Sequence, residues 1–147
     1  MKNNFLSKTE IPENLPDEMR KVINEIKRSP NQKQCLERSY KIMTGRYRGY
    51  RFQTFTKFFQ IFTFSVKDLW NKTGFMHCHN MSYLMRILLV KSGFFNNNDI
   101  ENKWTLVWYV SPHQYLQVKL NSGEYINIDI WGAAHGIKFG SYAHGFH

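Results

Sequence analysis

One stretch near the middle of the chain decides how the rest can fold: Cys78-His79-Asn80-Met81-Ser82-Tyr83-Leu84-Met85-Arg86-Ile87-Leu88-Leu89-Val90. Its apolar residues recur at intervals of three and four, which is the spacing of one face of an α-helix. Further apolar side chains between them indicate a helix that is covered on most sides. Lys91-Ser92-Gly93 then provides a cationic last turn and a glycine suited to the left-handed position after a helix. We predict a central helix that begins at Cys78.

The position of Cys78 at the start of this helix has a chemical consequence. The N-terminus of a helix carries partial positive charge and free N–H groups, and both favour a thiolate over a thiol. A cysteine there is also a small hydrophobe that packs well, so burial alone is an alternative interpretation. His113 and Asp129, which come later in the chain, favour the reactive interpretation. A thiol, an imidazole and a carboxylate together suit acyl chemistry.

Length and composition indicate one domain. The chain has 147 residues, of which 42% are hydrophobic, enough for one sizeable core. We expect residues 1–15 to form a flexible basic arm and residues 16–147 a single domain. The N-terminus lacks the apolar run of a signal peptide, and the longest uninterrupted apolar run, 87–90, is too short to span a bilayer. We therefore expect a cytoplasmic protein in which Cys35 and Cys78 are free thiols.

The positive charge is concentrated near the N-terminus. Net charge is +9, and residues 1–57 hold 13 Lys or Arg against 6 Asp or Glu. The segment Arg46-Tyr47-Arg48-Gly49-Tyr50-Arg51-Phe52 alternates cations with aromatic rings, a combination that binds phosphate and stacks on bases. A solvated basic loop with inward aromatic rings is the alternative, since no nucleic-acid-binding motif accompanies the segment. We expect at most weak nucleic-acid binding, through Arg46, Arg48 and Arg51.

The N-terminal half of the chain has the pattern of several helices. Pro16-Asp17-Glu18 opens the first, with an apolar stripe that runs to Ile26, and a second is expected over Gln32–Met43, ending before Gly45. The phenylalanine-rich segment 52–64 fits a helix lining the core, with a substrate-facing aromatic patch as the alternative. Ser65 with Asp68 fits a capping box, so a short helix should run to about Trp70.

The C-terminal half changes to strand patterns. Residues 105–110 are rich in β-branched and aromatic types, and residues 114–120 and 125–130 alternate polar with apolar. We predict an α+β fold in which the helix that bears Cys78 packs on a C-terminal antiparallel sheet. The glycine-rich tail beyond residue 131 is expected to cover part of the domain.

The loop between the last two strands determines which residues meet. Asn121-Ser122-Gly123 suits a three-residue hairpin with glycine in the left-handed position, which makes the numbers of paired residues sum to 244. His113 and Asp129 then become diagonal neighbours on one face of the sheet. At that distance a carboxylate accepts a hydrogen bond from one imidazole nitrogen, while the other nitrogen faces the thiol.

Residues 65–131 resemble the transglutaminase-like superfamily, within the broader papain-like group of cysteine enzymes. The residues that carry the resemblance are Cys78 at the head of an apolar helix, His113 opening a strand after Pro112, and Asp129 in Tyr125-Ile126-Asn127-Ile128-Asp129. The resemblance implies that Cys78 is the nucleophile, His113 the general base and acid, and Asp129 the orienting carboxylate. It also implies a thioester intermediate on a peptide or protein substrate, passed to water by a protease or amidase or to an amine by an acyltransferase.

Other functions remain as alternatives. His77-Cys78-His79 is a potential group of zinc ligands, but adjacent residues seldom converge on one ion, so we expect no metal and no cofactor. A non-catalytic member of the fold would act as a basic binding module for nucleic acid or protein. For an enzyme, the Cys78 N–H would be one oxyanion donor, and the second would come from Gln53, Gln60, Trp70 or a backbone group.

Overall fold

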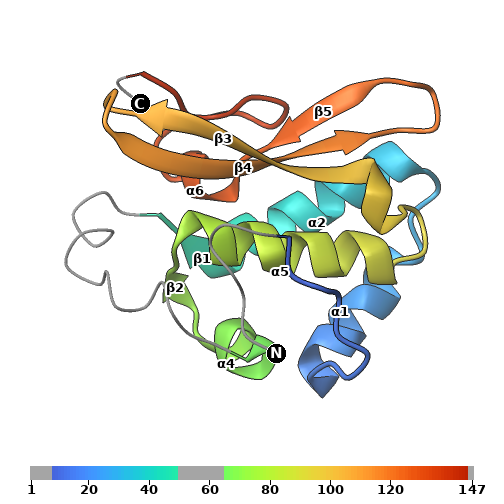
Figure 1. The fold of residues 1–147 in the computed structure, drawn as a ribbon. Helices are drawn as coiled ribbons and strands as arrows, with labels where there is room; N and C mark the ends of the chain where they lie inside the picture. Colours follow the sequence, from blue (N-terminus) through green and yellow to red (C-terminus); the bar gives the residue numbers. More distant parts are fainter. Residues whose placement is uncertain (1–7, 50–64, 146–147) are drawn as a thin grey trace.

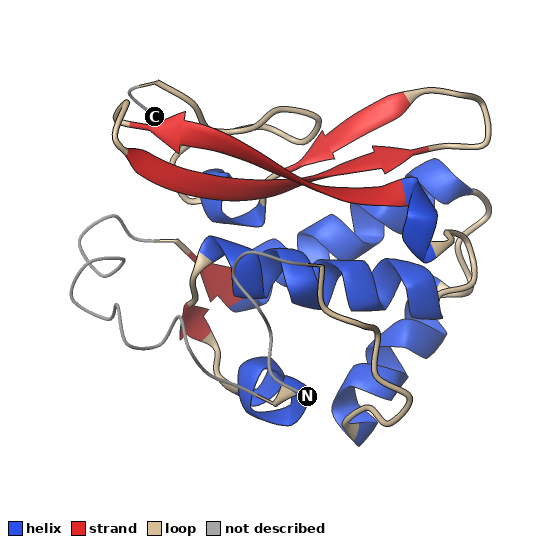
Figure 2. Ribbon diagram, viewed as in Figure 1, coloured by secondary structure: helices blue, strands red, loops and turns tan. Residues whose placement is uncertain are grey.

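The computed structural model describes residues 8–49 and 65–145, and these form a mixed α+β fold built around one helix. That helix, α5 (Cys78–Lys91), has a three-stranded antiparallel sheet on one side (Figure 1). The helix α2 (Gln32–Arg46) lies beside it, and α1 (Asp17–Ile26) and α4 (Val66–Asn71) lie on the side away from the sheet (Figure 2). No helix within the described ranges has the length and apolar character needed to cross a membrane.

The helix α5 confirms the prediction made from its apolar spacing. It begins at Cys78 and ends at Lys91, and every residue from His79 to Leu89 is buried. Gly93 follows with φ +83°, the left-handed conformation that glycine adopts without a steric penalty. A helix buried on all sides is a core element, so the sheet and the other helices pack around it.

The first two helices follow the sequence pattern with one difference. In α1 the side chains of Met19, Ile23 and Ile26 are buried, as the predicted stripe requires. In α2 the side chain of Asn31 caps the N-terminus by accepting the N–H of Gln34 at 2.9 Å. The prediction that this helix ends before Gly45 is wrong, because α2 continues to Arg46.

The chain after α2 forms a small parallel ladder. The strand β1 (Tyr47–Arg48) pairs with β2 (Gly74–Phe75), which directly precedes α5. Between them, α4 begins as predicted: the Ser65 hydroxyl accepts the Asp68 N–H at 3.3 Å and donates to the Asp68 carboxylate at 2.7 Å. The predicted helix over 52–64 lies outside the described residues.

The C-terminal sheet has the order β3-β4-β5, and all of its neighbours are antiparallel. Its strands are β3 (Ile100–Val107), β4 (Ser111–Lys119) and β5 (Tyr125–Ile128), with a short 3-10 helix η2 (Asn97–Asp99) leading into β3. The pairs Leu116↔Ile128 and Lys119↔Tyr125 both sum to 244, so the predicted register is confirmed. The predicted strand over 105–110 has other bounds in the structure, where β3 begins at residue 100 and ends at 107. It ends there because the chain turns at Trp108 and Tyr109, which both have positive φ.

Residues 8–15 differ from the expected flexible arm. Thr9 and Leu15 are buried, and the guanidinium of Arg86 in α5 donates a hydrogen bond to the Thr9 carbonyl. The Tyr83 hydroxyl donates to the Glu10 carbonyl at 3.2 Å. A buried guanidinium must find hydrogen-bond acceptors, and Arg86 takes one from this segment and another from Oδ1 of Asn97 at 2.9 Å. Charge and composition do not reveal such a contact, because the two partners lie 77 residues apart.

The tail covers the face of the sheet that points away from α5. The Tyr142 ring stacks on Tyr115 with ring centroids 4.2 Å apart, and Gly140 forms a bridge with Asn127. This agrees with the predicted covering segment. The tail therefore closes over the strand that carries His113.

Candidate active site

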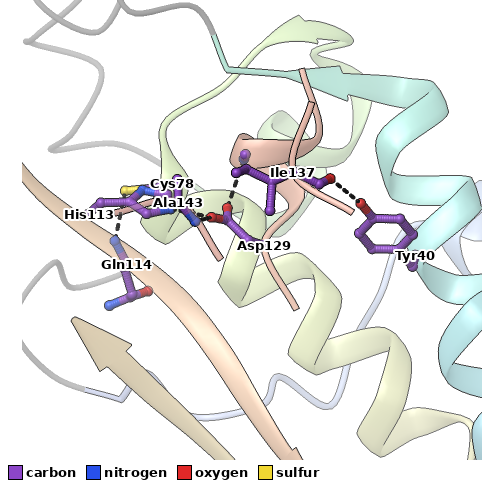
Figure 3. Close-up of polar contacts among 8 residues, drawn as sticks. Tyr40, Cys78, His113, Gln114, Asp129, Ile137 and Ala143 are labelled. Carbon is purple, nitrogen blue, oxygen red and sulfur yellow. Dashed lines mark hydrogen bonds and ion pairs between the residues drawn. The ribbon is translucent and has the colours of Figure 1, made fainter. Parts of the chain in front are cut away.

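Cys78 is the first residue of α5, and its sulfur lies against the edge of β4 (Figure 3). The backbone N–H of Gln114 donates to its Sγ at 3.4 Å. This N–H is available because β5 pairs with β4 only from Leu116 onward. A helix N-terminus and a backbone donor therefore both stabilise negative charge on the sulfur. Cys78 as a whole residue is partly exposed.

His113 connects the thiol to a carboxylate. Its Nε2 lies 2.7 Å from Oδ2 of Asp129, and both side chains are buried. The charge of the ring also lowers the pKa of the Cys78 thiol, and since Nε2 is engaged by Asp129, Nδ1 is the ring nitrogen left for the sulfur. The predicted diagonal contact between His113 and Asp129 is confirmed. Three residues separated by 35 and 16 positions in the sequence are thus brought together at one site.

The Asp129 carboxylate is held by two further donors. Oδ1 accepts the Gly132 N–H at 2.8 Å, and Oδ2 accepts the Ala143 N–H at 2.8 Å. The first bond makes Asp129 the N-cap of a short helix, α6 (Ile130–Ala133), so the prediction that a strand runs to Ile130 is wrong. The carboxylate satisfies the helix N–H, and the strand ends there. A Cβ at position 132 would lie 2.6 Å from Oδ2, so glycine is required for this approach.

The pKa values of the thiol and the imidazole move in opposite directions. Burial alone would raise the pKa of the Cys78 thiol, but the hydrogen bonds and charges of His113 and His79 lower it to about 6. Burial alone would lower the pKa of His113, but its hydrogen bonds to Asp129 and to Cys78 raise it to about 10. Each shift depends on the charge of the other group, so the two groups titrate as a pair. At neutral pH the pair is a thiolate and an imidazolium.

The two histidines that flank Cys78 have different surroundings. His79 is buried, and its interaction with the thiol helps to lower the pKa of Cys78. His77 packs edge-to-face on Phe75 with ring centroids 5.0 Å apart. Over residues 8–49 and 65–145, no three or more His, Cys, Asp or Glu side chains gather as metal ligands would.

Sequence reasoning missed the residues that enclose the pair. The Trp131 ring packs on His113 at 4.8 Å and on His135 at 4.4 Å between centroids. A Cβ at Gly49 would overlap the Trp131 ring, so the backbone directly after β1 approaches this tryptophan closely. The available signal was a tryptophan two residues after Asp129, but the two-residue period of a strand does not apply there because the helix α6 begins at Ile130.

The basic and aromatic segment after α2 is partly engaged in packing. The Arg46 guanidinium lies 4.1 Å from the centroid of the Trp70 ring and donates to the Trp70 carbonyl at 2.6 Å. Tyr47 is buried and donates to the same carbonyl at 2.7 Å. Arg48 is exposed, and Arg51 lies outside the described residues.

The structure places only some of the four groups suggested as a second oxyanion donor. Gln53 and Gln60 lie outside the described residues. The Trp70 indole N–H is buried and has no hydrogen-bond acceptor in the described part of the chain, but its ring packs under Arg46. Among backbone groups, the N–H of Gln114 already points at the Cys78 sulfur.

Comparisons with known proteins add no relative to this site. No protein-family model matches the chain, and neither does a curated protein or a solved structure. The geometry around Cys78 is therefore the basis for a function.

Proposed function

We propose that this chain is a transglutaminase-like cysteine enzyme, which transfers an acyl group or hydrolyses an amide or peptide bond through a thioester on Cys78. The observation that carries the proposal is the position of His113, whose Nε2 lies 2.7 Å from the Asp129 carboxylate and whose neighbour Gln114 contacts the Cys78 sulfur through its N–H, so that the imidazole lies beside the thiol. A positioned imidazole between a nucleophile and a carboxylate is the arrangement that acyl transfer requires.

The first half of the reaction uses the preformed ion pair. The Cys78 thiolate attacks the substrate carbonyl carbon, an S–C bond forms, and the π electron pair of the carbonyl moves to oxygen. When this intermediate collapses, the C–N bond breaks and the His113 imidazolium gives its Nδ1 proton to the leaving amine. A thioester and a neutral imidazole remain.

The second half regenerates the enzyme. His113 takes a proton from water or from an acceptor amine as that molecule attacks the thioester, and the Cys78 thiolate leaves. Water gives a carboxylic acid, and an amine gives a new amide. Because Asp129 is fixed by the Gly132 and Ala143 N–H groups, it holds one imidazole orientation through both halves.

Two backbone donors are available to the oxyanion. The Cys78 N–H belongs to the first turn of α5, and the Gln114 N–H lies 3.4 Å from Sγ. In the intermediate the oxygen is bonded to the carbon that Sγ has attacked, so it lies near both groups. Donors aimed at developing charge are commonly the largest contribution to such reactions.

Trapping the thioester tests the proposal. The protein is incubated with 4-nitrophenyl acetate, and mass spectrometry locates the acetyl group and its removal by hydroxylamine. We expect a hydroxylamine-sensitive acetyl group on Cys78, little or none on Cys35, and strong slowing in the His113→Ala variant.

Cys35→Ala serves as the matched control, since it removes the other thiol and should keep the acetylation of Cys78. Acetylation of Cys35 at the rate of Cys78, or a rate at Cys78 that His113→Ala leaves unchanged, would contradict the enzymatic function. Adding a primary amine separates the two reactions, because an acyltransferase releases the acetyl group faster as amide, whereas a hydrolase releases acetate.

A further inference from the structure

The hairpin of β3 and β4 extends beyond the N-terminal end of α5 (Figure 1). Directly paired residues lie on the same face of an antiparallel sheet, so the register assigns each side chain to a face. The pairs Ile100↔Val118 and Asn102↔Leu116 lie on the face that packs on α5. The next pairs on that same face are Trp104↔Gln114 and Leu106↔Pro112. The apolar face of the sheet therefore continues past the start of the helix.

Burial changes sharply along this face. Leu116 and Val118 are fully buried, whereas Trp104 is 40% exposed and Leu106 is 49% exposed. Pro112, opposite Leu106, is also exposed. Single exposed apolar residues are common, but these three are neighbours on one sheet face, and such a patch marks a binding surface. We call Trp104, Leu106 and Pro112 the apolar shelf.

The apolar shelf begins one strand away from the nucleophile. The Gln114 N–H contacts the Cys78 sulfur at 3.4 Å, and Trp104 is the cross-strand partner of Gln114. Neighbouring strands are about 4.8 Å apart and the sulfur lies on the β5 side of β4, so the backbone of Trp104 lies about 8 Å from the thiol, within the reach of one side chain. The nearest charges on β3, Glu101 and Lys103, pair with each other at 2.8 Å on the opposite face. An apolar group attached near the reacting carbonyl would therefore meet no unpaired charge from β3.

The backbone around the shelf is held in place by the tail. The Gly145 N–H donates to the Leu106 carbonyl at 3.0 Å, and the Trp108 N–H donates to the Gly145 carbonyl. Trp108 and Tyr109 have φ values of 56° and 58°, a conformation that bulky residues rarely adopt and that the surrounding contacts must maintain. A surface that is ordered before binding loses little entropy when a ligand arrives.

We propose that the apolar shelf binds an aromatic or long aliphatic side chain of the acyl donor, next to the carbonyl that Cys78 attacks. This inference rests on the proposed function and adds to it the substrate class, an amide whose acyl part carries an apolar side chain. Trp104 and Leu106 are then the residues that determine specificity.

Two alkylating probes separate the shelf from the thiol. Iodoacetamide is small and reports only the reactivity of Cys78. Acetyl-phenylalanyl chloromethyl ketone, in which the thiolate displaces chloride, places an aromatic side chain beside the reacting carbon, and its aspartyl analogue places a carboxylate there. We expect the phenylalanyl probe to label Cys78 about tenfold faster than the aspartyl probe, as partial burial of one aromatic side chain predicts.

Variants assign the preference to the shelf. Trp104→Ser and Leu106→Ser should each reduce the preference for the phenylalanyl probe several-fold and leave the iodoacetamide rate unchanged, which also shows that the site is folded. Tyr125→Ser is the matched control, since Tyr125 is an aromatic residue 57% exposed on the same sheet, at the other end of β5 from Asp129. It should keep the full preference.

Each outcome has a defined meaning. If iodoacetamide labels Cys78 no faster than Cys35, the proposed function fails and the shelf proposal falls with it. If iodoacetamide is selective for Cys78 but the phenylalanyl preference is absent, or persists in both shelf variants, only the shelf proposal is overturned. The protein could also be a dimer that Trp104→Ser converts to a monomer without changing the probe preference. That result would identify a second copy of this chain as the occupant of the shelf and would overturn the shelf proposal.

Discussion

The two cysteines of this protein lie in one core but have opposite surroundings. Cys35 sits within α2, is fully buried, and has its sulfur 3.4 Å from the Ser92 hydroxyl. Cys78 is the first residue of α5, is partly exposed, and contacts His113 and the Gln114 N–H. Burial raises the pKa of the Cys35 thiol, whereas the imidazoles beside Cys78 outweigh its burial and lower that pKa to about 6.

The difference teaches that charge and position, rather than burial alone, decide what a cysteine does. The Cys35 thiol donates to the Ser92 hydroxyl, and neither the uncharged hydroxyls of Ser92 and Ser39 nor the charge of Arg38 offsets the desolvation of a thiolate there. Near Cys78 an imidazolium and the start of a helix are both positive. One thiol is thereby a packing group, and the other is the nucleophile of the function we propose.

The largest expected effect is selective alkylation. At pH 7 a thiol of pKa about 6 is about 90% thiolate, whereas a thiol with its pKa raised above 9.0 is at most about 1% thiolate. Limiting iodoacetamide should therefore label Cys78 at least about 100-fold faster than Cys35, as measured by peptide mass spectrometry. Because a thiolate forms as pH rises through the pKa, labelling of Cys78 should rise between about pH 5 and 7 and then level off. Equal rates at both cysteines would remove the contrast.

His113→Ala should make Cys78 behave more like Cys35. The substitution removes the imidazolium, so the pKa of Cys78 should rise and its iodoacetamide labelling at pH 7 should fall about 10- to 100-fold. The pH profile of labelling measures this directly, and its midpoint should move upward from about pH 6. A profile identical to that of wild type would show that His113 does not act on the thiol.

Asp129→Asn is the companion change and should have a smaller effect on labelling. The amide can still hydrogen-bond the imidazole, but it carries no charge to stabilise imidazolium. Its NH2 group would also face either the Gly132 or the Ala143 N–H, so we expect a loss of about 1–3 kcal/mol in the free energy of unfolding. Circular dichroism during thermal unfolding measures the stability and confirms that the labelled protein is folded.

Cys35→Ala should show the reverse pattern. The sulfur fills space in the core, so its loss should lower the free energy of unfolding by about 1–2 kcal/mol. The rate of Cys78 labelling should not change. The matched variant Cys78→Ala should abolish labelling at that position and change stability less, because Cys78 is only partly buried. Urea denaturation of both variants makes the comparison, and a larger stability loss in Cys78→Ala would reverse the assignments.

The smallest expected effect concerns His79. Its hydrogen bond contributes to the low pKa of Cys78 after that of His113, so His79→Leu should raise this pKa slightly. Labelling at pH 6 should then fall about threefold, while labelling at pH 8 stays the same because the thiolate is already complete. Loss of labelling at both pH values would instead indicate that His79 positions the backbone of α5.

Much of the fold could be predicted from local pattern. The start of α5 follows from apolar spacing, and the capping of α4 follows from Ser65 and Asp68 three residues apart. The contact between His113 and Asp129 follows from hairpin length, because a three-residue loop leaves one register.

Other features had no local signal. The exposed Gly45 suggested that α2 would end, since glycine within a helix costs about 1 kcal/mol. The contacts of Arg46 with Trp70, 24 residues away, accompany the extra turn. The anchoring of residues 8–15 by Arg86 likewise joins distant segments, so no window of sequence contains both partners.

The sequence by itself determined which residue types could do chemistry and which helix and hairpin would carry them, because helical and strand periods are local properties. Only the tertiary structure decided that the Gln114 N–H contacts the thiol, that Ala143 and Gly132 hold Asp129, and that Trp131 packs on His113. These contacts depend on where β5 stops pairing and how the tail folds back over the sheet. Both follow from the packing of the whole core, and packing is a property of distant residues together.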